Sequence, residues 1–472
     1  MSFETLDPRT PARRRTFLMG AASAPAIAAL SSLSAADDQL PHAAAPAKYV
    51  IYLFMSGGPS HVDTFDHKPE LQRRHGEPIP ESFLDDVHFA MIPATTRQPR
   101  LQGSPFRFQQ CGESGLMVSE LFPQTAGVVD QIAVVRSVHS RVFNHDPAVN
   151  LLNTGDSRVG RPTMGAWVSY GLGNPSKQFP SYIVMTSGQK RQPLLTSYWS
   201  SGFLPTQHQG VELRRSGDPI LFLSSPEGVN HQQRMQQLDM IRQLNQQRYE
   251  QTLDPEILTR IKQYEIACRL QTAAPKLINL SSETKATLTS YGADPQKPSF
   301  ARNCLLARRM VESGVRFIQL YDMGWDSHDS LEASHRRQCD AVDRPIAALI
   351  RDLEQRGLLE ETLVVWGGEF GRTPVIQGSG TAWGRDHHPH GFSMWMAGGG
   401  IRGGVVHGQT DEFGFHAVQD RVDVHDIHAT VLHALGIDHT KLTYRHQGRD
   451  FRLTDTGGRV IPELLSAPQG VL

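Results

Sequence analysis

The sequence predicts an α/β protein with a mostly parallel central sheet. Short apolar runs typical of strands buried on both faces occur at residues 49–55, 132–135, 182–185, 315–320, 362–366 and 392–397. Helical patterns separate several of these runs, and a long one at 335–356 leads into the run at 362–366. Because strands that alternate with helices form parallel sheets with helical cover, this order favours one large α/β domain.

Residues 1–36 have the pattern of an export signal. The core Arg14-Arg15-Thr16-Phe17-Leu18 precedes an Ala-rich stretch at 19–33, and small residues follow at 34–36. A basic region, a weakly apolar region and a small-residue cleavage site form a signal peptide. The paired arginines resemble a twin-arginine signal. We therefore expect the twin-arginine translocase to export the chain, which makes the mature protein periplasmic or secreted. An uncleaved anchor is the alternative.

The rest of the chain is expected to form one unit. Residues 37–47 are interpreted as a linker and 48–472 as the α/β domain, with a Gln-rich helical insertion at about 230–291. The insertion is expected to lie on the sheet or near the mouth of the site. No apolar run after the signal approaches the ~18 residues that a stable membrane span needs.

The charge and histidine content narrow the classes of function. Lys plus Arg number 47 and Asp plus Glu 48. This balance argues against a protein that binds nucleic acid through a broad basic face. Of the 21 histidines, ten lie between His387 and His446. Because imidazole binds metals and carries protons near neutral pH, this density indicates metal or acid–base chemistry.

Candidate metal ligands lie next to the predicted strands. His61 and Asp63 follow the run at 49–55, and an extended segment would direct both to one side. Helix capping is the alternative role for Asp63. Asp326 and His328 follow the run at 315–320, and Glu369 follows the run at 362–366 between closely spaced glycines.

A turn with three histidines completes this set. His387, His388 and His390 come directly before the run at 392–397. Ligands in open α/β sheets collect at the carboxyl ends of strands. A mixed set of oxygen and nitrogen donors suits zinc or a similar divalent cation.

Three further residues are candidates for catalysis. Ser140 precedes a helical-looking stretch, and a hydroxyl at a helix N-terminus is well placed to attack an anionic ester. Capping that helix is its alternative role. Arg372 and Arg385 are expected to balance the charge of the transferred group.

Five motifs together resemble a known superfamily. They lie at residues 54–63, 324–328, 367–374, 384–389 and 448–452. Their order resembles the alkaline-phosphatase-like superfamily, which includes phosphatases, phosphodiesterases, sulfatases and phosphoglycerate mutases. A closer resemblance is to a bacterial family, domain of unknown function 1501, whose members are often exported by the twin-arginine route.

The resemblance implies a three-layer α/β/α fold and a metal site around a tetrahedral anion. By position, Asp326 and His328 match the Asp/His pair of the superfamily, and Glu369 matches the Asp of its Asp-His-Gly motif. Phe370 stands where that motif has a metal-binding His. The terminal His of the superfamily matches one of the three histidines at 387–390. The formylglycine maturation motif of sulfatases is absent from the sequence.

The expected function is an exported metal-dependent hydrolase of phosphate, phosphodiester or sulfate-type esters. Its substrate would be a small molecule or a polysaccharide with an anionic ester, and its cofactor one or two divalent ions. Zinc is preferred, with calcium, magnesium and manganese as alternatives. Two alternatives remain for the function: an enzyme in which water attacks directly, and a non-catalytic envelope module that binds carbohydrate or protein and holds a structural metal.

Overall fold

A computed structural model describes residues 45–84, 87, 89–93, 98–176, 178–188, 194–215 and 228–466. The predicted signal peptide at 1–36 lies outside the described residues, as does nearly all of the predicted linker at 37–47. Within the described ranges, no helix combines the length and apolar character of a segment that crosses a bilayer.

The central sheet has nine strands in the described part of the chain. Its strands are β1 (Tyr49–Ser56), β4 (Ile132–His139), β5 (Tyr182–Gly188), β6 (Val211–Leu213), β7 (Phe317–Met323), β8 (Thr362–Gly367), β11 (Phe392–Ala397), β12 (Val405–His407) and β15 (Val422–Asp423). The order is β12-β4-β11-β8-β1-β7-β5-β6, and β15 pairs with β4. Apart from β11, which runs antiparallel to β4 and β8, the pairs are parallel. The predicted fold class is confirmed.

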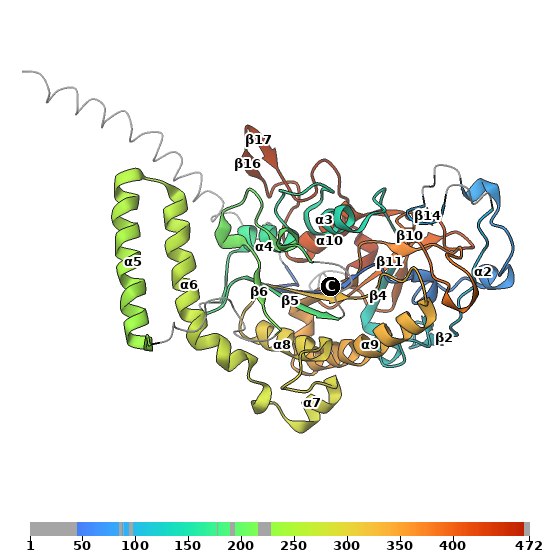
Figure 1. The fold of residues 1–472 in the computed structure, drawn as a ribbon, viewed down its shortest axis with the longest axis horizontal. Coiled ribbons are helices and arrows are strands. Elements are labelled where there is room, and N and C mark those ends of the chain that lie inside the picture. The colour runs from blue at the N-terminus through green and yellow to red at the C-terminus, as the bar shows by residue number, and fades with distance from the viewer. Residues whose placement is uncertain are drawn as a thin grey trace, which may run out of the picture.

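Helices cover both faces of this sheet. The α-helices of the described residues are α2 (Pro69–Arg73), α3 (His145–Thr154), α4 (Met164–Leu172), α5 (His231–Thr252), α6 (Pro255–Ile278), α7 (Lys285–Tyr291), α8 (Phe300–Glu312), α9 (Leu331–Gln355) and α10 (Val424–Ala434), of which several cover the sheet. Figure 1 shows α8 and α9 below the sheet and α3, α4 and α10 above it. Each face carries its own apolar core, and β1 contributes to both because it is buried throughout except for Tyr49. The molecule is therefore a three-layer α/β/α structure.

Part of the helical segment at 230–291 packs against the core, and part projects away from the sheet on which it was expected to lie. Asn230 begins α5 with a capping box, in which its side chain accepts from the Gln233 amide. Figure 1 shows α5 and the adjoining part of α6 standing away from the body as a hairpin. Leu270 and Leu277, in the C-terminal part of α6, are buried in the core on the α8 side. Among the α6 side chains that the structure describes, the buried apolar ones in this core are Leu270, Ala274 and Leu277.

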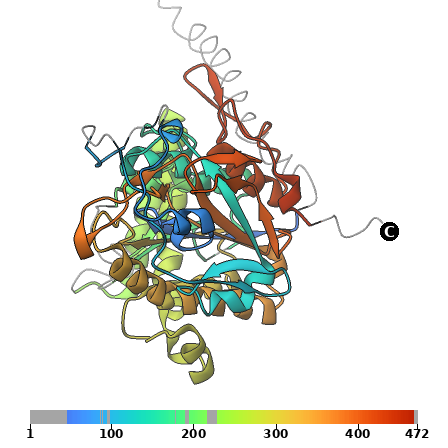
Figure 2. The same ribbon diagram turned by 90° about the vertical axis from the view of Figure 1, so that its right-hand side faces the viewer.

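Several two-stranded sheets decorate the body. They pair β2 (Phe108–Cys111) with β3 (Leu116–Ser119), β9 (Gly371–Arg372) with β10 (His387–His388), β13 (Gln409–Thr410) with β14 (Ala417–Gln419), and β16 (Tyr444–His446) with β17 (Arg449–Phe451). In Figure 2 the red β16–β17 hairpin lies at the top and the yellow-green α7 at the bottom, so the two mark opposite ends of the molecule.

The register of the sheet brings distant loops to one edge. Ser56 lies opposite Met323, and Phe54 lies opposite Gly367, so β1, β7 and β8 end side by side. The approach is close: a Cβ on Gly57, whose φ is +118°, would lie 2.3 Å from the backbone nitrogen of Asp326. Glycine is required there because it tolerates this φ and leaves room for the neighbouring loop.

Candidate metal centre

Four side chains from three separate loops converge at this edge. His145 is the first residue of α3, Asp326 and His328 lie in the loop after β7, and His387 lies in β10. One nitrogen or oxygen atom from each lies within 4.8 Å of every other. We call these four residues the donor cluster.

The distances inside the donor cluster are short. The Asp326 Oδ1 atom lies 3.0 Å from His328 Nε2, 3.4 Å from His145 Nε2 and 3.5 Å from His387 Nε2. The Nε2 atoms of His328 and His387 are 2.9 Å apart. A tetrahedral zinc site with bonds of about 2.0–2.1 Å has ligand atoms about 3.3 Å apart. Four of the six separations between donor atoms, 2.9 to 3.5 Å, therefore lie close to that value.

The Nδ1 atom of each imidazole, on the side away from the cluster, bonds to an acceptor on the protein. His145 Nδ1 lies 2.6 Å from Glu369 Oε1, and His387 Nδ1 lies 2.8 Å from the Phe143 carbonyl oxygen. His328 Nδ1 lies 2.7 Å from Gln377 Oε1. Because these partners accept hydrogen bonds, they assign the proton to Nδ1 in each neutral ring. The same arrangement orients metal-bound histidines in proteins.

These tautomers leave lone pairs facing one another. The lone pairs of His328 and His387 meet across 2.9 Å, and His145 Nε2 is buried without a hydrogen-bond partner. Such an arrangement is repulsive unless a positive centre lies between the donors. The donor set, three imidazole nitrogens and one carboxylate oxygen, fits a divalent cation of the zinc type.

Glu369 supports the cluster from a buried position. Its two carboxylate oxygens accept from the Gly57 amide at 2.9 and 3.1 Å, and its Oε1 accepts from His145. The side chain is fully buried. Glu369 therefore fixes the orientation of His145 and joins the loop after β1 to α3.

Arg372 supports Asp326 in a similar way. Its guanidinium donates to Asp326 Oδ1 at 2.7 Å and to the carbonyl oxygens of Gly58 and Gly57. It is fully buried. Arg372 therefore neutralises the carboxylate and holds the β1 loop against it.

The electrostatics of the cluster keep Asp326 ionised. Burial raises the pKa of Asp326, but the contacts with His145, His328 and His387 and the charge of Arg372 outweigh it, so this pKa lies far below its usual range. Burial lowers the pKa of His387 to about 4 despite Asp326. Burial also lowers the pKa of His145, but the neighbouring carboxylates of Asp326 and Glu369 prevail and raise it. At neutral pH His387 is therefore a neutral donor beside a charged carboxylate.

The cluster is open to solvent on one side. The side chains of Asp326 and His328 are 21% and 22% exposed, whereas that of His387 is 7% exposed. Phe370 covers another side, with its ring centroid 4.6 Å from that of His387 and 4.9 Å from that of His145. A ligand can thus reach the cluster from the side of Asp326 and His328.

The structure brings together five of the residues that the sequence singled out. Asp326, His328 and His387 belong to the donor cluster. Glu369 lies one step further out, against His145, and Arg372 lies against Asp326. Glu369 thus lies behind an imidazole rather than among the donors.

Four other predicted residues lie in a neighbouring buried network. Asp63 forms an ion pair with Arg385, with Oδ2 2.8 Å from Nε, and accepts from Ser60. His61 Nε2 lies 2.7 Å from the Gly414 carbonyl oxygen, and His388 Nε2 bonds to the Phe415 carbonyl oxygen. An arginine thus pairs with Asp63, and a backbone carbonyl takes the Nε2 atom of each histidine, while His61 Nδ1 is buried without a hydrogen-bond partner. All four residues lie outside the donor cluster.

His390 and Ser140 also lie outside the donor cluster. The ring of His390 contacts those of His388 and His416, with centroids 5.5 and 5.7 Å apart. Ser140 is buried at the end of β4, where its Oγ accepts from the Val142 amide at 3.2 Å. The structure thus makes Ser140 the cap of a turn in this loop, and the helix-capping alternative is wrong because the N-cap residue of α3 is Asn144.

His145 is the donor that the sequence reasoning did not choose. It lies after β4 at the start of α3, the helical stretch that was expected to follow Ser140, but Ser140 was selected there for its hydroxyl. The available signal was a histidine at the first position of a helix beyond a buried strand. Its partner Glu369 is 224 residues away, so the pairing itself was not visible in the sequence.

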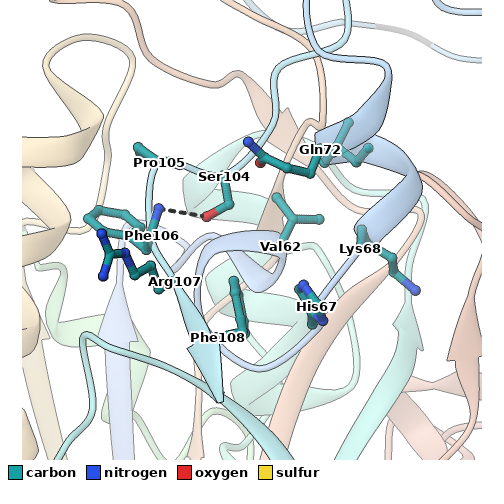
Figure 3. A pocket seen from close by; sticks show the side chains of 10 residues that line it. Val62, His67, Lys68, Gln72, Ser104, Pro105, Phe106, Arg107 and Phe108 are labelled. Carbon is teal, nitrogen blue, oxygen red and sulfur yellow. Dashed lines mark hydrogen bonds between the residues drawn. The ribbon is translucent and has the colours of Figure 1, made fainter.

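A cavity of about 460 Å³ lies elsewhere, beside α2 (Figure 3). It is lined by Val62, His67, Lys68, Leu71, Gln72, Ser104, Pro105, Phe106, Arg107 and Phe108. The rings of His67 and Phe108 stack with centroids 4.7 Å apart, and Ser104 accepts from the Phe106 amide. None of the four donors lines this cavity, so it is separate from the candidate metal centre.

Comparison with family models identifies the family of the chain. The model described as "Protein of unknown function (DUF1501)" matches residues 47–465. The chain therefore belongs to this family. Comparison with curated proteins gives no match.

Solved structures give distant likenesses. The PsFucS1 sulfatase from Pseudoalteromonas sp. is 12% identical, with a TM-score of 0.33 over 87% of this chain and 71% of that one. The lipoteichoic acid synthase LtaP from Listeria monocytogenes is 8% identical, with a TM-score of 0.37 over 90% and 80%. The alkaline phosphatase of the Antarctic bacterium TAB5 is 10% identical, with a TM-score of 0.33 over 82% and 98%.

Proposed function

We propose that the chain is an exported metal-dependent hydrolase of anionic esters, with one divalent cation, preferably zinc, at the donor cluster. The observation that carries this proposal is the convergence of three Nε2 lone pairs and the Asp326 carboxylate, each imidazole being held at Nδ1 by an acceptor. A bound divalent cation would supply a Lewis acid that polarises the ester and lowers the pKa of an attacking water.

The side chains around the cluster have distinct roles in this proposal. Glu369 keeps His145 in the tautomer that directs Nε2 to the centre. Arg372 holds Asp326 in place and ionised. Phe370 excludes water from one side, and the opening at Asp326 and His328 admits the substrate. The chain thus orients the donors through fixed hydrogen bonds.

Direct attack by water is the preferred route. The Ser140 hydroxyl is buried and caps its own loop, so it is poorly placed for a covalent intermediate. The donor cluster also offers four protein ligands for one cation and has Phe370, rather than a further imidazole, beside it. A single ion therefore suits the site better than a pair.

One observation favours a second function, a non-catalytic envelope module with a structural metal. Four protein donors can fill the coordination of a tetrahedral zinc, whereas catalytic zinc sites keep a position for water. The solvent-exposed sides of Asp326 and His328 favour the hydrolase instead, because a fifth ligand can approach there. Export through the twin-arginine translocase is part of both proposals, and so is an anionic or carbohydrate ligand outside the cytoplasm.

Metal analysis followed by a substrate panel tests the proposal. Purified mature chain is expected to contain about one equivalent of zinc or a related ion and to hydrolyse at least one of a phosphomonoester, a phosphodiester and a sulfate ester. Removal of the ion by a chelator should abolish turnover, and zinc should restore it. One bound ion without turnover on any ester would establish the structural-metal module; no bound ion would refute both functions.

A further inference from the structure

The two arginines expected to balance the charge of the substrate, Arg372 and Arg385, already donate all their hydrogen bonds to groups within the protein. Arg372 donates to the carbonyl oxygens of Gly57, Gly58 and Arg385 and to Asp326. Its side chain and that of Arg385 are fully buried.

Arg385 is engaged just as completely. It donates to both oxygens of Asp63, at 2.8 and 3.3 Å, and to the carbonyl oxygens of Thr373 and Gly103. Neither guanidinium can therefore reach a ligand without breaking internal bonds.

A third arginine, Arg141, lies in the loop that leads into the donor cluster. Residues 140–144 connect β4 to α3, and the next residue is the donor His145. This loop is anchored at both ends: the Ser140 amide donates to the Pro389 carbonyl oxygen at 2.8 Å, and His387 Nδ1 donates to the Phe143 carbonyl oxygen at 2.8 Å. The loop is thus bonded directly to a donor of the cluster.

Arg141 is available for a ligand. It is exposed, and no hydrogen bond or ion pair holds its guanidinium among the residues that the structure describes. The neighbouring start of α3 has a positive helix dipole and no side-chain cap from Asn144, with Asp146 as the acidic residue of its first turn. An arginine without an internal partner in the described part of the chain thus stands on an anchored loop that is bonded to His387.

We propose that Arg141 binds the tetrahedral oxyanion group of the substrate and so determines the preference of the site for anionic esters. This inference rests on the proposed function, because it takes the donor cluster as the centre that the substrate approaches. The guanidinium would donate hydrogen bonds to two oxygens of a sulfate or phosphate group while the opposite side of that group faces the cluster. It deepens the proposal by assigning the charge recognition to a residue other than Arg372 and Arg385.

Three variants of the full mature chain test this assignment: Arg141→Ala, Arg141→Lys and the control Arg158→Ala. Arg158 is a comparable arginine beyond the other end of α3, with a side chain that is 83% exposed and paired with Asp156. Zinc content is measured for each protein, and binding of inorganic phosphate and of sulfate to the zinc-loaded proteins is measured by calorimetry.

Arg141→Ala is expected to weaken anion binding by about 10- to 100-fold, because a charge-assisted hydrogen-bonding group is lost. Zinc content should stay unchanged. Arg141→Lys should retain part of the affinity, since it keeps the charge without the fork, and Arg158→Ala should bind as the unaltered chain does. Where an ester is turned over, kcat/KM for 4-nitrophenyl phosphate should fall in Arg141→Ala while that for neutral 4-nitrophenyl acetate stays.

The outcomes separate this inference from the proposed function. Equal anion affinity in Arg141→Ala and the unaltered chain, or no anion binding by the zinc-loaded chain, would overturn the role of Arg141. Zinc uptake with Arg141-dependent anion binding but without ester turnover would support Arg141 and refute the hydrolase. Turnover that is indifferent to Arg141 would support the hydrolase and refute this assignment.

Discussion

The donor cluster and the buried network beside it contain the same residue types but use them for different purposes. The donor cluster has three imidazoles bonded at Nδ1, so their Nε2 lone pairs meet at Asp326. In the buried network beside it, His61 and His388 bond through Nε2 to carbonyl oxygens, and Asp63 is paired with Arg385. The comparison teaches that the atom left over after internal hydrogen bonding decides which histidines are donors.

The sharpest case is a pair of adjacent residues. His387 and His388 both lie in β10, and successive side chains of a strand point to opposite sides. One joins the donor cluster and the other the buried network. Variants of these two residues therefore test the comparison directly.

The largest effect is expected from His387→Ala. This change removes a donor and is expected to lower metal content from about one equivalent to near zero, a loss of affinity greater than the ~10- to 100-fold typical of a lost supporting partner. His388→Ala is the matched control and should keep its metal while losing thermal stability. Metal content by elemental analysis after dialysis distinguishes them. Similar metal loss in both variants would erase the distinction between the two regions.

The next largest effect is expected from breaking the ion pair of the buried network. Arg385→Met leaves the buried Asp63 carboxylate without its partner and should cost about 3–5 kcal/mol of the free energy of unfolding. Lys48→Met, in a pair with Glu361 whose side chains are 56% and 40% exposed, should change the free energy of unfolding far less, because solvent screens an exposed pair. Chemical denaturation at neutral pH measures both. A small loss in Arg385→Met would mean that the network contributes little to the fold.

A smaller loss, about 3 kcal/mol of the free energy of unfolding, is expected when the pH is lowered, because His335 becomes protonated. This buried ring accepts the Ser60 amide at Nε2, and burial lowers its pKa from 6.5 to about 4. Because the unfolded chain takes up a proton first, stability present above pH 6.5 should fall as the pH drops towards 4.

His335→Gln removes this titrating group. The pH dependence of the free energy of unfolding, measured by urea denaturation from pH 7 to pH 4, should therefore become shallower in the variant. An unchanged slope would show that His335 is not the group responsible.

The smallest effect is expected from Glu369→Gln, which alters the support of a donor and not a donor. The amide is a weaker acceptor for His145 Nδ1, so metal affinity should fall by about 10- to 100-fold. Glu332→Gln, at an exposed position in α9, should leave the affinity unchanged. Competition with a zinc chelator gives both values. Affinity lost as completely as in His387→Ala would make Glu369 a ligand itself.

The strands were predictable because each is a local pattern. The apolar runs at residues 49–55 and 392–397 form β1 and β11, and both strands are buried on two faces. The insertion at 230–291 was predicted as helical but not as a projecting hairpin. Its Gln-rich sequence indicates helices but does not indicate what those helices contact.

The site was predictable only in part for a similar reason. Asp326, His328 and His387 stand next to strands, so their meeting at one edge follows from a parallel sheet. His145 needs Glu369 behind it, and that bond crosses 224 residues. The partner that occupies Asp63 is as distant, 322 residues along the chain.

The sequence by itself determined the α/β class, the strands and the supply of imidazole and carboxylate groups near their ends. Only the tertiary structure decided which nitrogen of each histidine forms a hydrogen bond within the protein and which is left for a ligand. The physical reason is that strand and helix patterns are local properties of the chain. A hydrogen-bond partner for a buried side chain depends instead on which distant backbone the fold brings within about 3 Å.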